Sequence, residues 1–68
     1  MALFDNNRSY QPSDPEILTL LGSKSKQAQM RHHRRGPIYF RLGRKIIYQG
    51  SDLNAWAEAN RHDPAEQV

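Results

Sequence analysis

The fold is decided by a segment in the middle of the chain, Ile38-Tyr39-Phe40-Arg41-Leu42-Gly43-Arg44-Lys45-Ile46-Ile47-Tyr48. Two runs rich in aromatic and β-branched residues flank a polar stretch that contains a glycine, and this pattern is typical of a β-hairpin. We expect the turn at residues 43–45, with basic side chains at its tip. Alternation along the two strands predicts four side chains that face the core: Phe40, Leu42, Ile46 and Tyr48.

A short helix is predicted before the hairpin. Ser13 as N-cap with Glu16 three residues later forms a capping box, and Pro15 is tolerated in a first helical turn. The apolar residues of 17–21 form a stripe, and Gly22 supplies a left-handed stop. This helix spans about eight residues.

A second helix follows, capped by Ser23 or Ser25 and running to about Arg34, where the Gly36-Pro37 pair ends it. Its few apolar residues predict that only a narrow edge contacts the core. Two helices joined by a turn that contains glycine form a helix-turn-helix pattern.

A last helix is predicted after the hairpin, capped by Ser51 or Asp52, with Leu53 and Trp56 facing inward. The expected fold is therefore a small α+β domain over residues 12–60. Residues 1–11 are expected to form a flexible N-terminal tail, and residues 61–68 a C-terminal one.

Length and composition exclude several classes of function. The chain has 68 residues and no cysteine, which leaves no disulfide, thiolate nucleophile or cysteine-based metal site. No apolar run reaches the ~18 residues of a membrane span, and no secretory signal is recognisable. The adjacent His32 and His33 lack the spacing of metal ligands, and the serines are explained as helix caps. We therefore expect a binding module without metal, cofactor or enzymatic activity.

The charge is strongly segregated along the sequence. Residues 17–51 contain eight of the ten basic residues and none of the seven acidic ones. Mixed signs are the rule on an ordinary soluble surface, and a block of one sign creates a local positive potential. The sequence therefore predicts a polyanionic partner, with nucleic acid favoured.

Residues 36–48, together with Ser51-Asp52-Leu53-Asn54-Ala55-Trp56, resemble the excisionase and AlpA-like group of MerR-type winged helix-turn-helix proteins. The shared features are the Gly-Pro turn, the Arg-Leu-Gly-Arg wing, a strand that ends in tyrosine and the start of the last helix. Leu20-Leu21-Gly22 is similar to the end of the family's first helix. The resemblance covers residues 12–60 and implies a winged helix-turn-helix with the hairpin as its wing.

In such a fold the second helix enters the major groove of duplex DNA. The expected contacts from this helix are Lys24, Ser25, Lys26, Gln27, Gln29, Arg31, His32 and Arg34. Glutamine can pair with adenine, and lysine or arginine with guanine, while Arg31 is expected close to the phosphates. The wing is expected to contribute Arg41, Arg44 and Lys45 along the backbone or in the neighbouring minor groove.

The resemblance also implies a biological role. Excisionases bind in tandem near an attachment site and bend DNA, which directs an integrase, a tyrosine recombinase, towards excision. Double-stranded DNA, integrase and further copies of the chain are therefore the expected partners, in the cytoplasm of a bacterial or phage-infected cell. An AlpA-like transcriptional regulator remains an alternative, as do an RNA-binding module and a protein adaptor.

Overall fold

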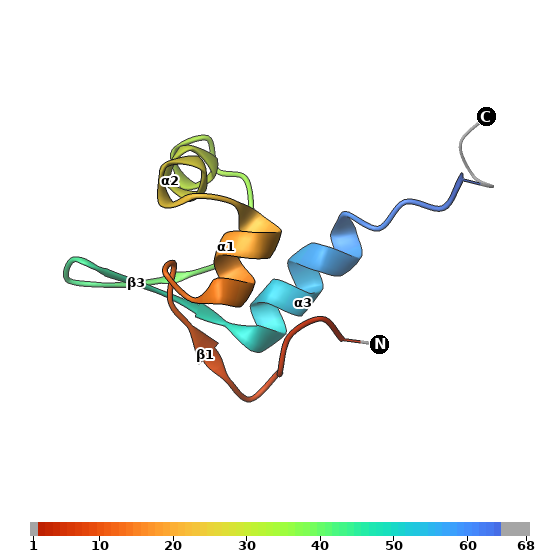
Figure 1. Cartoon of the computed structure of the whole chain (residues 1–68), viewed down its shortest axis with the longest axis horizontal. Helices are drawn as coiled ribbons and strands as arrows, with labels where there is room; N and C mark the ends of the chain where they lie inside the picture. Colours follow the sequence, from red (N-terminus) through yellow and green to blue (C-terminus); the bar gives the residue numbers. More distant parts are fainter. Residues whose placement is uncertain (1, 65–68) are drawn as a thin grey trace.

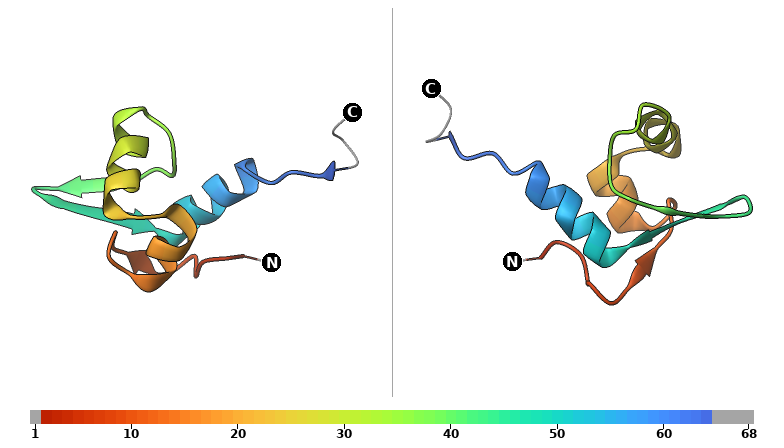
Figure 2. Two further views of the ribbon diagram at one scale, coloured as in Figure 1. Left: turned by 45° about the horizontal axis from the view of Figure 1, so that its top comes forward. Right: turned by 180° about the vertical axis from the view of Figure 1, so that it is seen from behind.

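The computed structural model describes residues 2–64, and over that range it has three helices and a three-stranded antiparallel sheet. In chain order the elements are β1 (Ser9–Tyr10), α1 (Pro15–Leu21), α2 (Lys24–His32), β2 (Phe40–Leu42), β3 (Lys45–Gln49) and α3 (Gly50–Ala59). Figure 1 shows the β2–β3 hairpin projecting from one end of the molecule and α3 extending towards the other. Helix α1 lies between them, and α2 lies on the same half of the molecule as the hairpin, as the two further views in Figure 2 also show.

The hairpin is confirmed, but its turn is one residue shorter than predicted. Gly43 and Arg44 connect the strands, so that Leu42 pairs with Lys45 and Phe40 with Ile47. Gly43 has a φ of 64°, in the left-handed region that favours glycine. Because residues that pair across strands share a face, residues 40 and 42 lie on the face of residues 45 and 47.

The predicted inward orientation of Phe40 and Leu42 is therefore wrong. Their exposed fractions are 51% and 61%, whereas Tyr48 is buried and Ile46 packs against the core from the opposite face. A three-residue turn would have placed all four on one side, and the two-residue turn reverses the faces of β2 relative to β3. The outer face of the hairpin consequently exposes two large apolar side chains beside Lys45.

The buried core gathers residues from the N-terminal segment, the strands β1 and β3, and the helices α1 and α3. Its buried hydrophobic members are Phe4, Tyr10, Ile17, Leu21, Tyr48 and Leu53, and the partly buried Met30, Ile46 and Trp56 pack against them. The inward positions of Leu53 and Trp56 agree with the sequence. Helix α2 contributes only Met30 to this cluster, as its polar composition predicted.

The N-terminal segment is not the flexible tail that the sequence predicted. Tyr10 pairs with Tyr48 in the sheet, and the ring of Phe4 packs edge-on against the Tyr10 ring at 5.3 Å between centroids. The Asn54 side chain accepts a hydrogen bond from the Phe4 backbone N–H at 2.9 Å and donates one to the Phe4 carbonyl at 2.8 Å. The folded unit therefore begins near Phe4 and not at residue 12.

Three predicted helix caps have different outcomes. Ser23 caps α2 as predicted, because its Oγ accepts a hydrogen bond from the Lys26 N–H. The capping box at Ser13 is wrong, since Asp14 occupies the N-cap of α1 without a side-chain cap bond. The N-cap of α3 is Gln49 and precedes the predicted Ser51 or Asp52, because the helix starts directly after β3.

The predicted C-terminal tail begins just after α3, whose C-cap is Asn60. Residues 61–64 are exposed. The remainder of that predicted tail, residues 65–68, lies outside the described residues. Of the helices between residues 2 and 64, none combines the length and hydrophobicity that crossing a bilayer requires.

Candidate nucleic-acid interface

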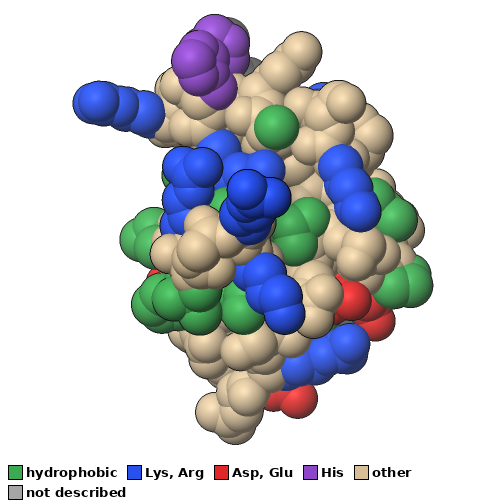
Figure 3. Space-filling view, turned by 90° about the vertical axis from the view of Figure 1, so that its left-hand side faces the viewer, with side chains coloured by type: hydrophobic (Ala, Val, Ile, Leu, Met, Phe, Trp, Pro, Cys, Tyr) green, Lys and Arg blue, Asp and Glu red, His purple; other side chains and the backbone are tan. Residues whose placement is uncertain are grey.

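A groove runs between α2 and the hairpin, and positively charged side chains line it. Its volume is about 600 Å³, and its lining comprises Ala28, Arg31, His32, Arg34, Tyr39, Arg41, Arg44 and Ile46. A second hollow shares Arg31 and Arg44 with this groove and adds Lys24 and Lys45. Figure 3 shows this end of the molecule, with lysine and arginine side chains gathered over its middle and acidic ones confined to its lower part.

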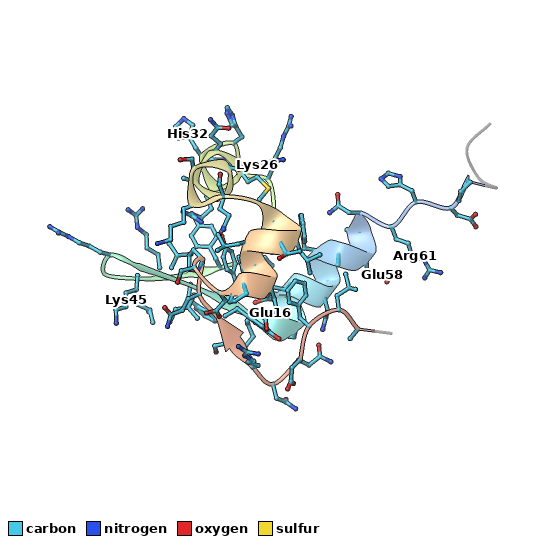
Figure 4. All side chains as sticks on the ribbon, viewed as in Figure 1. Glu16, Lys26, His32, Lys45, Glu58 and Arg61 are labelled. Carbon is cyan, nitrogen blue, oxygen red and sulfur yellow. The ribbon has the colours of Figure 1, made fainter. Side chains whose placement is uncertain are left out.

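These cations have no acidic partners among the described residues. The ion pairs found between residues 2 and 64 join Arg8 to Glu16 at 3.7 Å and Arg61 to Glu58 at 3.1 Å. Both pairs lie outside residues 24–45. Figure 4 shows Lys45 at the hairpin end, whereas Glu58 and Arg61 lie at the opposite end of the molecule. The surface around α2 and the hairpin therefore keeps an uncompensated positive potential.

The exposed face of α2 carries most of the residues predicted to contact DNA. Ser25, Gln29 and His32 are exposed and follow one another at the three- and four-residue spacing of one helix face. Lys24 and Arg31 lie on the flank that faces the hairpin, where both line the hollow at its tip. Lys26 is exposed and its aliphatic chain lies against Gly22 on the other flank.

The hairpin residues also lie as the predicted interface requires. Arg41, Arg44 and Lys45 are all exposed. Arg41 pairs with Ile46 across the strands and lines the groove that faces α2, while Arg44 occupies the second position of the turn. The structure therefore brings the predicted wing residues and the hairpin-facing flank of α2 to one surface.

Gln27 is the exception, and its prediction as a base-contacting residue is wrong. Its side chain is completely buried, with an exposed fraction of 0%. The Nε2 group donates hydrogen bonds to the carbonyl oxygens of Pro12 at 3.0 Å and Gly22 at 2.9 Å. Gln27 thus fixes α2 against the segments that flank α1, which is a structural role.

The C-terminal end of α2 holds an arginine in a conformation normally reserved for glycine. The helix ends at His32, two residues before the predicted end, and Arg34 has a φ of 56°. The N–H groups of Arg34 and Arg35 donate to the carbonyls of Arg31 and Met30, which together form a Schellman motif. A non-glycine residue in this left-handed position is strained by roughly 1–2 kcal/mol.

Replacing Arg34 with glycine should therefore stabilise the fold. We expect Arg34→Gly to raise the free energy of unfolding by about 0.5–1 kcal/mol, because relief of the strain outweighs the flexibility that glycine adds to the unfolded chain. The matched control is Arg35→Gly, which removes the same charge at a residue without a positive φ and should reduce stability. Urea unfolding followed by circular dichroism measures both. A loss of stability in Arg34→Gly would contradict the left-handed C-terminal cap.

Sequence reasoning missed Arg35 and Tyr39 on this surface and the contact that the buried Tyr48 makes beneath it. Arg35 lines a hollow together with Arg31, Arg34 and Tyr39, and its place in the basic run of residues 31–35 was an available signal. Tyr39 and Tyr48 pack edge to face at 6.5 Å between ring centroids beside the Arg31 guanidinium. No signal in the sequence connects these tyrosines to Arg31, since the contact depends on how α2 crosses the sheet.

Compared with known proteins, the chain matches no family model, no curated protein and no solved structure. Its function must therefore be inferred from the geometry and charge of the surface formed by α2 and the hairpin.

Proposed function

We propose that the chain is a double-stranded DNA-binding protein with the architecture of a small winged helix-turn-helix. In this proposal α1 and α2 form the helix-turn-helix, α2 is the recognition helix, and the β2–β3 hairpin is the wing. The observation that carries the proposal is the convergence of unpaired cations from two separate elements, α2 and the hairpin, on one surface.

The dimensions of α2 suit the major groove. A helix with its side chains is about 10–12 Å wide, close to the ~12 Å width of the major groove of B-DNA. Nine helical residues extend about 13 Å, enough to place two turns of side chains against the bases. The exposed Ser25, Gln29 and His32 are the proposed base-contacting residues. Lys24, Arg44 and Lys45 are proposed to contact the backbone on either side.

The arrangement of the aromatic residues near the hairpin favours duplex DNA over single-stranded RNA as the ligand. Single-strand binders stack successive bases on aromatic side chains that share an open face of a sheet. Here Tyr48 is buried, and Tyr39, just before β2, points to the opposite side from Phe40, the first residue of β2. No continuous stacking platform is formed by these three residues, so the positive surface is better matched to a duplex backbone.

The proposed biological role follows from the resemblance of residues 36–56 to excisionase and AlpA-like proteins. We propose that the chain acts as an excisionase, binding in tandem near an attachment site on a mobile element and directing an integrase towards excision. A single small module buries only roughly 600–1,000 Å² on DNA, so its affinity as one copy should be modest. Several copies on adjacent sites would supply the missing affinity.

A pair of arginine variants tests the proposed interface. Arg44→Ala removes one charge from the hairpin tip, and Arg61→Ala removes the same charge from the far end, beyond α3. We expect Arg44→Ala to weaken binding about fivefold to tenfold at 0.1 M salt and to reduce the slope of log K against log[salt] by about one. Arg61→Ala should change neither quantity.

The measurement is fluorescence anisotropy of a labelled duplex across a salt series. Equal losses in Arg44→Ala and Arg61→Ala would mean that only the net charge matters, and the proposed surface would be wrong. A footprint on the attachment site tests the biological role: extended, cooperative protection supports tandem binding, and a single isolated half-site contradicts it.

A further inference from the structure

Three polar side chains form a chain of hydrogen bonds that runs from the buried side of α2 to its hairpin-facing flank. The Tyr48 hydroxyl donates a hydrogen bond to Gln27 Oε1 at 3.4 Å and accepts one from Arg31 Nη1 at 2.7 Å. Tyr48 is only 1% exposed, and Gln27 is anchored in turn to the backbone carbonyls of Pro12 and Gly22. A partly exposed cation is thus hydrogen-bonded to a buried side chain that is itself linked through Gln27 to the backbone.

The Arg31 guanidinium is also held from a second direction. Its central carbon lies 5.7 Å from the centre of the Tyr39 ring, within the range of a cation–π contact. Arg31 is half-buried and lines each of the three hollows around α2 and the hairpin. A free arginine loses much side-chain entropy when a ligand immobilises it, and here much of that loss precedes binding.

The ligand that suits this position is a phosphate. A guanidinium carries five N–H donors, and Tyr48 occupies one nitrogen while no carboxylate contacts the group among the described residues. Arg34, Arg41 and Arg44 line the same groove, which adds positive potential but leaves no acceptor of comparable charge. Guanidinium and phosphate oxygens form strong, geometrically defined hydrogen bonds.

We propose that Arg31 is a preorganised clamp for one phosphodiester of the DNA backbone, and that Tyr48 is its positioning residue. This inference rests on the proposed DNA-binding function and specifies which cation is fixed before binding. Arg31 then sets the register of the protein on the duplex, whereas the exposed lysines and Arg44 contribute charge that is not fixed in advance. Tyr48 itself stays in the core and does not contact DNA.

The first test separates position from charge. Tyr48→Phe keeps every charge and should weaken duplex binding about fivefold, with an unchanged salt slope, because the released Arg31 side chain must then lose its conformational entropy on binding. Arg31→Ala should weaken binding more and reduce the slope by about one. In a variant that combines Arg31→Ala with Tyr48→Phe, the second substitution should cause no further loss of affinity, because the guanidinium that Tyr48 positions is absent.

Tyr10→Phe is the matched control. Tyr10 is a second buried tyrosine, 4% exposed, whose hydroxyl accepts a hydrogen bond from the Asp5 N–H and not from a residue of α2. Removing its hydroxyl should leave DNA affinity unchanged when the protein is kept fully folded. Arg31→Lys keeps the charge but loses the fork of donors, and it should reproduce the effect of Tyr48→Phe if the phosphate contact depends on geometry.

A second measurement needs no DNA. The heteronuclear NOE of the Arg31 Nε–Hε group should be high in the wild-type protein, fall in Tyr48→Phe, and exceed that of the exposed Arg61 throughout. If the wild type binds DNA and Tyr48→Phe binds it with the same affinity, the positioning role is overturned and the DNA-binding proposal stands. Failure of the wild type to bind any duplex would overturn both, whereas an Arg31 side chain as mobile as Arg61 would overturn preorganisation alone.

Discussion

Replacing Gly50 with alanine should unfold most of the protein. Gly50 is the first residue of α3, and a Cβ built there would overlap the carbonyl oxygen of Asp5 and lie 3.0 Å from that of Arg8. Both atoms are backbone, and the Gly50 N–H donates a hydrogen bond to the Arg8 carbonyl at 2.8 Å. We expect a loss of about 3 kcal/mol or more, since neither segment can yield without breaking the contact.

Helix propensity alone makes the opposite prediction, because alanine is favoured over glycine in a helix by about 1 kcal/mol. Thermal and urea unfolding of Gly50→Ala therefore separate the two expectations by their sign. Gly43→Ala is the control: Gly43 has a positive φ but nothing lies within 4 Å of its Cβ position, so its cost should be only about 1–2 kcal/mol. A Gly50→Ala variant as stable as the wild type would show that residues 4–10 are not packed against α3.

The glutamines Gln27 and Gln29 should behave as opposites. Gln27→Ala removes a buried side chain and leaves the Pro12 and Gly22 carbonyls and the Tyr48 hydroxyl without their partner. We expect it to reduce the free energy of unfolding by about 3 kcal/mol, a large part of the stability of so small a domain. Gln29→Ala should change stability by less than about 0.5 kcal/mol, because Gln29 is exposed.

For the specificity of DNA binding, we expect the larger effect from Gln29→Ala and the smaller one from Gln27→Ala. At a temperature where both variants are folded, Gln29→Ala should lower the preference for the target over random duplex, since Gln29 lies on the proposed base-contacting face. Gln27→Ala should alter binding only through the position of α2. Urea unfolding and competition anisotropy measure the two effects. A stable Gln27→Ala variant with altered base preference would place Gln27 at the interface and reverse the assignment.

The sequence was sufficient for the parts of the fold that depend on local patterns. The hairpin at residues 38–48, the Ser23 cap and the stop after α1 each follow from residue types within a few positions. The segregation of basic residues into residues 17–51 likewise predicted a local positive potential, and the structure gathers basic side chains around α2 and the hairpin. These features need no knowledge of distant contacts, and the structure agrees with them.

Two of the errors arose where distant contacts decide the outcome. The buried position of Phe4 depends on a hydrogen-bond pair with Asn54, fifty residues away, which no local pattern announces. The burial of Gln27 depends on two backbone carbonyls that only the folded chain brings together. A turn one residue shorter than expected was enough to reverse the faces of Phe40 and Leu42, because side chains alternate with a period of two.

The most direct test of the central claim is the salt dependence of binding to a duplex of about 25 base pairs, with single-stranded RNA of equal length as competitor. The surface formed by α2 and the hairpin predicts binding at low ionic strength, with a slope of log K against log[salt] of about −4 to −6 and a clear preference for the duplex. Absence of binding at about 20 mM salt, or equal affinity for the single-stranded RNA, would contradict it.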